Sequence, residues 1–281
     1  MGQKTNSTIT SLSVKNAKWK SRYIEKNLEE SSILLHKNVE IKDYLNKVFK
    51  SYGLIIHNSV IEYNQNTANF FITFFEKKPE TSKFCGQHNK LYSNIKSSKT
   101  LIEHIVNNVL KVDLNLFLNN KRVTFKIRNL NQKFEFLING SKLRLFQHKN
   151  ILRQSKRFLK DPLFKELIKI LFVAVTEKNS AKLIAESISR YFIKQKKRHG
   201  FLLFLLKKTL TNLISSDFSV IKGIKIVING RFNGAPRSNK KILNVNSVPL
   251  QSFDSSIDYY ESTAYTLNGT FGIKVWVCEK N

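Results

Sequence analysis

The residues of this sequence whose type and spacing best suit chemistry are two clusters of basic side chains, and that chemistry is phosphate binding. The first cluster lies between Ala181 and Lys208, where eight Lys and Arg residues accompany one acidic residue, Glu186. Arginine donates paired hydrogen bonds to a phosphate, whereas lysine acts as a point charge. The second cluster consists of Arg231, Arg237, Lys240 and Lys241, in a segment that Pro236 stiffens. Rings that can stack on bases or sugars are interspersed with the charge: Trp19, Tyr191, Phe192 and Phe232.

The whole chain is strongly basic. Its 281 residues include 48 Lys and Arg against 20 Asp and Glu, a formal charge of +28. Such a charge repels itself in a compact protein unless a polyanion balances it, and nucleic acid is the usual polyanion. Hydrophobic residues make up 41% of the chain, which is enough to bury a core. We therefore favour a nucleic-acid partner over the alternative of a merely well-solvated surface.

Other classes of site find little support in the sequence. Gly230 and Gly234 lack the lysine of a phosphate-binding loop, and Cys85 with His88 has no second pair to complete a zinc site. Three nearby carboxylates are interpreted as solvated acids, namely Asp254, Asp258 and Glu261. We expect no enzyme activity, no cofactor and no metal. Two cysteines indicate a reducing compartment, and the absence of a long apolar run predicts no membrane segment.

The first half of the chain is predicted to contain a basic arm and a small α+β unit. Residues 1–38 form the arm, which has no acidic residue before Glu25 and is typical of an organelle transit peptide. A helical period follows from Val39 to Tyr52, then strands at Leu54–Tyr63 and Asn69–Glu76, then a helix at Leu101–Leu110. Residues 112–165 show no clear period and are interpreted as an insertion, with a hairpin that pairs residues 123–127 and 134–138.

The second half, residues 166–281, is predicted to be two helices followed by an antiparallel sheet. Ile168–Val175 is a buried strand or a short helix, and periodicity does not decide between them. One helix follows Ser180 and ends at Gly200, and another spans Phe201–Ile214. The predicted strands are Gly223–Arg231, Ile257–Leu267 and Ile273–Val277, with Asn268-Gly269 as a hairpin turn.

Two parts of the sequence resemble small-subunit ribosomal protein three, a universal family. The start of the chain carries the segments Met1–Asn6 and Trp19–Tyr23. The C-terminal hundred residues carry the family's motifs in order, at Lys222–Ile226, Gly230–Ala235, Val248–Gln251, Ile257–Tyr259 and Gly272–Val277. The form of residues 230–237 and of 268–272 is most similar to mitochondrially encoded members from plants and protists. The abundance of residues with AT-rich codons, such as Lys, Asn, Ile and Phe, agrees with an organelle genome.

The resemblance implies a place in the head of the small subunit of the mitochondrial ribosome, in the matrix. There the family binds rRNA, helps to line the mRNA entry channel and adjoins ribosomal proteins of families ten, fourteen and two. It also implies a type II KH-like fold for residues 39–111, degenerate because Gly86 is the only glycine at the phosphate-clamping loop. Residues 166–281 would then be two helices packed on an antiparallel or mixed sheet. Neither a membrane nor a second copy of the chain is expected as a partner.

Charge clustering and family position together select the candidate RNA-binding residues. For rRNA these are Lys4, Lys20, Arg22, Arg231, Arg237, Lys240 and Lys241. For mRNA they are Arg190, Lys194, Lys196, Lys197, Arg198, Lys207 and Lys208. Bacterial members place cations at positions that match Leu202 and Leu203, so either the flanking cations supply that charge or an added protein covers an apolar surface. The alternative function is a free-standing organellar RNA-binding protein, such as a splicing factor.

Overall fold

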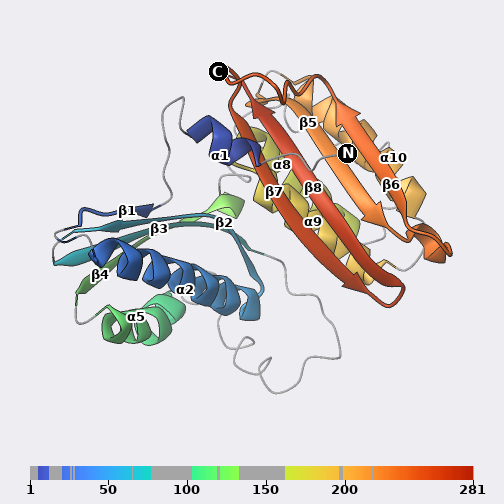
Figure 1. The fold of residues 1–281 in the computed structure, drawn as a ribbon. Coiled ribbons are helices and arrows are strands. Elements are labelled where there is room, and N and C mark those ends of the chain that lie inside the picture. The colour runs from blue at the N-terminus through green and yellow to red at the C-terminus, as the bar shows by residue number, and fades with distance from the viewer. Residues whose placement is uncertain are drawn as a thin grey trace. The chain divides into compact units, whose positions relative to one another are not determined.

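The computed structural model describes residues 6–12, 21–25, 27, 29–64, 66–76, 103–118, 121–132, 162–195, 199–216 and 218–280 (Figure 1). The chain divides into two units. One comprises Trp19–Asn129, and the other joins Met1–Lys18 to Leu130–Asn281. Each contains helices and a four-stranded sheet, so the α+β prediction is confirmed.

The unit Trp19–Asn129 is a mixed sheet covered by helices. Its elements are β1 (Ser21–Arg22), α2 (Glu30–Ser51), β2 (Leu54–Tyr63), β3 (Thr67–Glu76), the π-helix η1 (Ile105–Leu110), α5 (Lys111–Phe117) and β4 (Arg122–Asn129). The strand order is β1-β2-β3-β4, with β2 and β3 antiparallel and β3 and β4 parallel. The order of helix, two strands and helix is the KH-like arrangement that was expected, and β4 follows it as a further strand. The loop Phe84–His88, with Gly86, Cys85 and His88, lies outside the described residues.

The core of this unit lies between the sheet and the helices. Ile41, Leu45 and Phe49 recur every fourth residue of α2 and are buried against side chains of β3 such as Phe74. The helix ends at Ser51, and Gly53 follows it with a φ of 72°, the left-handed conformation that glycine adopts at low cost. The helical period predicted from Val39 onward in fact begins at Glu30, so the end of the expected arm belongs to α2.

Strand β4 lies within the residues interpreted as an insertion. Thr67 to Phe74 of β3 pair in parallel with Arg122 to Asn129 of β4. Among the described residues, the partner of this strand is therefore β3. The other half of the hairpin predicted from the sequence, residues 134–138, lies outside the described residues.

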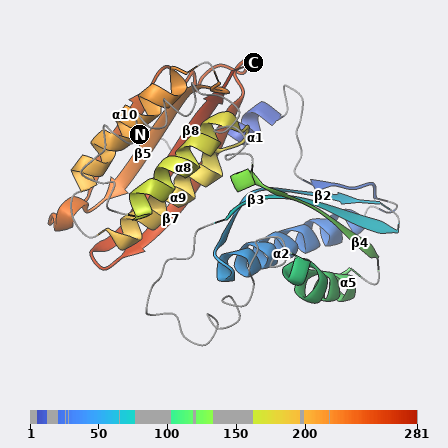
Figure 2. The same ribbon diagram turned by 180° about the vertical axis from the view of Figure 1, so that it is seen from behind.

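The second unit is layered. Its elements are α1 (Ser7–Leu12), α8 (Pro162–Thr176), α9 (Ala181–Lys194), α10 (His199–Ile214), β5 (Ile221–Gly230), the 3-10 turn η3 (Phe232–Gly234), β6 (Asn239–Val245), β7 (Ile257–Thr266) and β8 (Gly269–Glu279). The sheet is antiparallel with order β6-β5-β8-β7. Helices α8, α9 and α10 all lie on one face of it (Figure 2). Of these, α9 packs on β7 and β8, α10 packs on β5 and β6, and α8 contacts both helices.

Alternation along the central strands builds the core of this unit. Ile224, Ile226 and Ile228 of β5 are buried on the helix-facing side, as are Ile273 and Val275 of β8. The predicted strands are confirmed, although the two-residue loop of the hairpin is Leu267-Asn268, because Thr266 pairs with Gly269. The ambiguous segment Ile168–Val175 is helical and belongs to α8. Its residues from Ile170 to Val175 are all buried, which removes the periodicity that marks a surface helix.

Candidate nucleic-acid interface

A pair of reciprocal hydrogen bonds joins the start of α10 to the turn after β5. The Asn233 side-chain Oδ1 accepts from the backbone N–H of His199 at 3.0 Å, and the Asn233 backbone N–H donates to His199 Nδ1 at 3.1 Å. His199 Nε2 lies 2.8 Å from the carbonyl oxygen of Gln195, so the bonds fit the tautomer with its proton on Nε2. Asn233 has a φ of 55°, a left-handed conformation that asparagine tolerates better than most residues. The junction therefore ties the start of α10 to the turn that follows Arg231 of the second basic cluster.

Aromatic packing makes the junction rigid. The buried ring of His199 lies 5.0 Å from Phe192 of α9 and 5.4 Å from Phe271 of β8, measured between ring centroids. Phe232 closes the cluster, with its centroid 5.4 Å from that of Phe271. A Cβ on Gly230 would lie 2.2 Å from a ring carbon of Phe271, so glycine is required there. The backbone that carries the second basic cluster is thus fixed to three neighbouring elements.

The second cluster lies beyond this junction, on the turn and on strand β6. Arg231 and Arg237 are exposed, and Arg231 Nε donates to the carbonyl of Ala235 at 2.8 Å. Lys240 and Lys241 are exposed residues of β6 and pair in register with Asn229 and Ile228 of β5. The sequence pattern predicts no strand at these two lysines. Because neighbouring residues of a strand point to opposite faces, the sheet edge carries cations on both sides.

The first cluster is only partly available for binding. Lys194, Lys207 and Lys208 are exposed on α9 and α10. Arg190 differs, because its side chain is 29% exposed and pairs with Glu186 at 3.8 Å. Burial lowers the pKa of Arg190 below its ordinary value, and the nearby carboxylates oppose that shift. Arg190 is therefore already engaged with a carboxylate of its own helix.

Several predicted residues cannot be placed, and one lies in the other unit. Lys4, Lys20, Lys196, Lys197 and Arg198 lie outside the described residues. The last three occupy the sequence between Gln195 and His199, which are hydrogen-bonded to each other. In the unit Trp19–Asn129, Arg22 forms an exposed ion pair with Glu62 at 3.4 Å.

The positions that match the bacterial cations are inside the protein. Leu202 and Leu203 are only 2% and 5% exposed. The expectation that they form an apolar surface for an added protein is therefore wrong. The exposed apolar residues of α10 are instead Phe201 and Phe204, which the sequence analysis overlooked because the helix looked apolar on every side. Their spacing of three residues, continued by Lys207 and Lys208, is the signal that marks them as one face.

Two of the three carboxylates that were interpreted as solvated acids have structural partners. Asp258 Oδ2 accepts from the backbone N–H of Ala181 at 2.8 Å, at the start of α9, where negative charge is favourable. Glu261 accepts from the Tyr259 hydroxyl at 2.9 Å and lies 3.9 Å from Lys274. Among the residues that the structure describes, no group of acidic, His and Cys side chains could hold a metal ion. No helix in the described ranges is both long enough and apolar enough to span a membrane.

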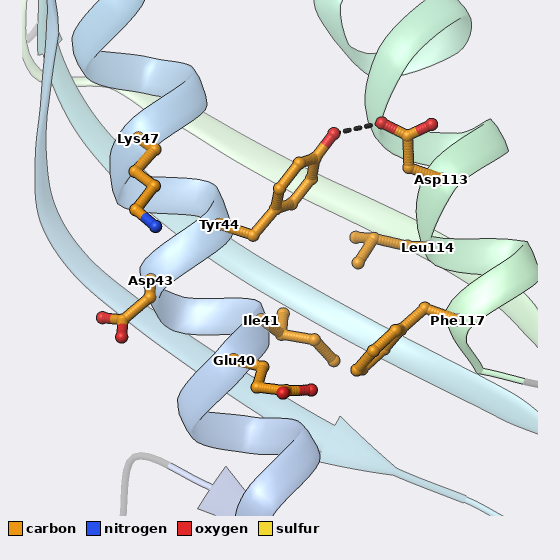
Figure 3. Close-up of a pocket in the computed structure, with 8 residues that line it drawn as sticks. All are labelled: Glu40, Ile41, Asp43, Tyr44, Lys47, Asp113, Leu114 and Phe117. Carbon is orange, nitrogen blue, oxygen red and sulfur yellow. Dashed lines mark hydrogen bonds between the residues drawn. The ribbon is translucent and has the colours of Figure 1, made fainter.

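The unit Trp19–Asn129 contains a hollow of about 490 Å³ between α2 and α5 (Figure 3). The Tyr44 hydroxyl donates to the carboxylate of Asp113 there. Burial, together with that carboxylate, raises the pKa of Tyr44 to about 12. The full lining is Glu40, Ile41, Asp43, Tyr44, Lys47, Asp113, Leu114 and Phe117. Three carboxylates against one ammonium make the hollow unsuitable for phosphate groups.

Comparison with known proteins points to one family. Residues 205–277 match the family described as ribosomal protein S3, C-terminal domain. The small ribosomal subunit protein uS3c of Euglena longa is 33% identical over 185 residues, which cover 64% of this chain and 81% of that protein. The uS3 protein of Neorickettsia sennetsu is 33% identical over 103 residues, 37% of this chain and 46% of its own length. The uS3 protein of Fusobacterium nucleatum is 37% identical over 99 residues, which cover 34% of this chain and 42% of that protein. The match thus spans less than half of each bacterial relative.

Proposed function

This chain belongs to the ribosomal protein S3 family, whose members are structural proteins of the small ribosomal subunit and not enzymes, and from that premise we propose its place and contacts. We propose that it binds rRNA in the head of the mitochondrial small subunit and lines the mRNA entry channel. The observation that supports the proposal is the junction of His199 with Asn233, which ties the start of α10, the helix that carries Lys207 and Lys208, to the turn that follows Arg231.

The mechanism is electrostatic. Helix α10 and the segment from Gly230 to Val245 contain no acidic residue, while six of the candidate cations there are exposed: Lys207, Lys208, Arg231, Arg237, Lys240 and Lys241. Each phosphate that such a surface neutralises releases condensed counterions. Binding should therefore weaken with salt, at a log–log slope of about −0.7 to −0.9 for each contact.

The mitochondrial location is supported by the AT-biased composition and by the motif at residues 230–237, which resembles mitochondrially encoded members. The test is density-gradient fractionation of an organelle lysate with a high-salt wash, followed by detection of this chain. We expect it in the small-subunit fractions of mitochondria. Recovery in a light fraction without stoichiometric rRNA would favour the free-standing RNA-binding protein instead.

The neighbours proposed from the family are ribosomal proteins ten, fourteen and two, with no second copy of this chain. Chemical cross-linking of purified small subunits, followed by peptide identification, tests this directly. Cross-links to those three families are expected. Cross-links between two copies of the same peptide of this chain would contradict the proposal.

The mRNA contact is proposed for the cations that flank the start of α10. Replacing Lys196, Lys197 and Arg198 by Ala should impair translation of structured messages more than it impairs subunit assembly. The measurement is translation of paired reporters, with and without a stable hairpin, beside gradient profiles. A variant that fails to assemble into small subunits but still translates the hairpin reporter as well as the parent chain does would contradict the proposed mRNA contact.

A further inference from the structure

One face of α10 combines exposed rings with exposed ammonium groups. Phe201 and Phe204 are 38% and 62% exposed, and their ring centroids lie 6.4 Å apart. Lys207 and Lys208 follow on the next turn and are exposed as well. We call these four residues the α10 stripe. The residues on the other sides of the helix, such as Leu202 and Leu206, are buried, so the stripe is the solvent-facing side.

The stripe is held in a fixed position. Helix α10 packs against α8 on one side and against β5 and β6 on another. Asn233 binds the first backbone N–H of the helix, at His199, two residues before Phe201. The backbone of a helix anchored in this way need not be ordered on binding, which lowers the entropic cost of recognition.

We propose that the α10 stripe is a stacking platform for single-stranded RNA, in which Phe201 and Phe204 stack on bases and Lys207 and Lys208 bind the linking phosphates. The proposal deepens the mRNA contact proposed above and rests on it. The two ring planes are inclined by 47°, so each ring can present its face to a separate base. Stacking on aromatic side chains tolerates any base, as a surface that meets every message requires.

Charge distinguishes RNA from a protein partner here. Helix α10 carries no acidic residue, and its two lysines lie one turn beyond the rings. Single-stranded RNA offers flat apolar faces at regular intervals along an anionic backbone, which complements this pattern. A protein partner would need apolar side chains placed beside its own acidic residues, and loss of a protein cross-link is therefore one outcome of the test below.

The test compares the full chain with a double variant, Phe201→Leu and Phe204→Leu. Leucine keeps apolar bulk and favours the helix more than phenylalanine does, but it removes the flat ring. The probes are a single-stranded oligouridylate and an abasic oligonucleotide with the same number of phosphates. The double variant should bind oligouridylate roughly five- to a hundredfold more weakly for each base that stacks. Its salt slope and its affinity for the abasic strand should match those of the parent chain.

Two matched variants complete the design. Phe253→Leu changes another exposed phenylalanine, 57% exposed and outside α10, and should leave both affinities unchanged. Lys207→Ala with Lys208→Ala should flatten the salt slope by about 0.7 for each lysine, for both strands alike. Comparing the double leucine variant with the double alanine variant separates the contribution of the rings to RNA affinity from that of the charges.

The outcome that overturns the platform is a double leucine variant that binds oligouridylate as tightly as the parent chain. If that variant also lost a protein cross-link within small subunits, the stripe would be a protein contact. Failure of the proposed function looks different, because the parent chain itself would then be missing from small-subunit gradient fractions. If the parent chain is found in the small-subunit fractions and the double leucine variant binds oligouridylate with unchanged affinity, the stacking platform is rejected and the proposed function is not.

Discussion

His199 and Asn233 bind each other through backbone and side chain at once, which makes each residue a donor and an acceptor for the other. The Asn233 side chain occupies the position of a helix cap for α10, although it comes from a distant part of the sequence. The His199 ring in turn holds the left-handed turn at Asn233 in place. This exchange fixes the geometry between the two groups of cations.

Replacing Asn233 tests the exchange. Asn233→Ala removes the cap and places a less tolerant residue at a φ of 55°, so we expect a loss of about 1–3 kcal/mol in unfolding free energy. Asn233→Gly removes the cap but relieves the backbone, and should cost less. Chemical denaturation of the full chain measures both. An alanine variant as stable as the parent chain would contradict the account.

Gly230 is predicted to be intolerant of any side chain. A Cβ there would lie 2.2 Å from the ring of Phe271, which is 1% exposed and enclosed by Phe192 and His199. Gly230→Ala should therefore destabilise the chain by about 1–3 kcal/mol, the cost of overpacking. Gly200→Ala is the matched control, since a Cβ at that helical position meets nothing within 4 Å. Thermal unfolding should show the control unchanged or slightly stabilised.

Removing the two positive charges of β6 should weaken RNA binding and reduce the dependence of the affinity on salt concentration. Lys240→Ala with Lys241→Ala should lower the affinity for small-subunit rRNA fragments and reduce the magnitude of the salt slope by about 0.7–0.9 for each lysine that contacts a phosphate. Lys178→Ala, an exposed lysine of the same unit outside both clusters, is the control. Equal losses from both variants would indicate a general effect of net charge and not a located contact.

Alkaline pH should destabilise the unit Trp19–Asn129 partly through Tyr44. Burial, with the Asp113 carboxylate, raises the pKa of this phenol to about 12 in the folded protein, above its ordinary value of 10.0. The folded state therefore holds the proton more tightly than the unfolded state does. The contribution of Tyr44 to the free energy of unfolding is complete below pH 10 and is lost between about pH 10 and 12. Tyr44→Phe should be less stable than the parent chain at pH 8, and that difference should shrink above pH 10.

Tyr63→Phe is the natural comparison for this alkaline effect. Burial alone raises the pKa of Tyr63 to about 12, and among the described residues its hydroxyl has no hydrogen-bond partner. The substitution should cost little at pH 8 and should protect the fold above pH 10. The free energy of unfolding is measured from pH 8 to 12 for the parent chain and both variants. Parallel curves for all three would contradict the raised pKa values of Tyr44 and Tyr63.

The parts of the fold that follow from local pattern could be predicted from sequence. Ile224, Ile226 and Ile228 alternate because one face of β5 is buried, and Ile41, Leu45 and Phe49 follow a helical period for the same reason. Segment Ile168–Val175 resisted assignment since it is buried on every side and has no polar face to set a period. The periodicity of apolar residues reveals secondary structure in a segment with one buried and one exposed face. It gives no signal in a segment that is buried on every face.

The features that depend on distant partners could not be predicted. Strand β6 was missed because only Leu243 and Val245 are buried in a segment otherwise rich in exposed polar residues. The parallel pairing of β4 with β3 joins segments far apart in the sequence. For the candidate interface, the two groups of cations could be found by counting charges. The link between the start of α10 and the turn after β5 could not be found in this way, because the contact of His199 with Asn233 follows from no local rule.

The enclosure of α10 between α8 and the sheet has an evolutionary consequence. Most of its positions are committed to the interior, so a change at Leu202 or Leu206 would demand compensating changes in neighbouring elements. Heritable variation in what this helix contacts should accordingly concentrate at Phe201, Phe204, Lys207 and Lys208, where substitution is structurally cheap. Divergent lineages could then alter what this helix binds without disturbing the architecture that carries it.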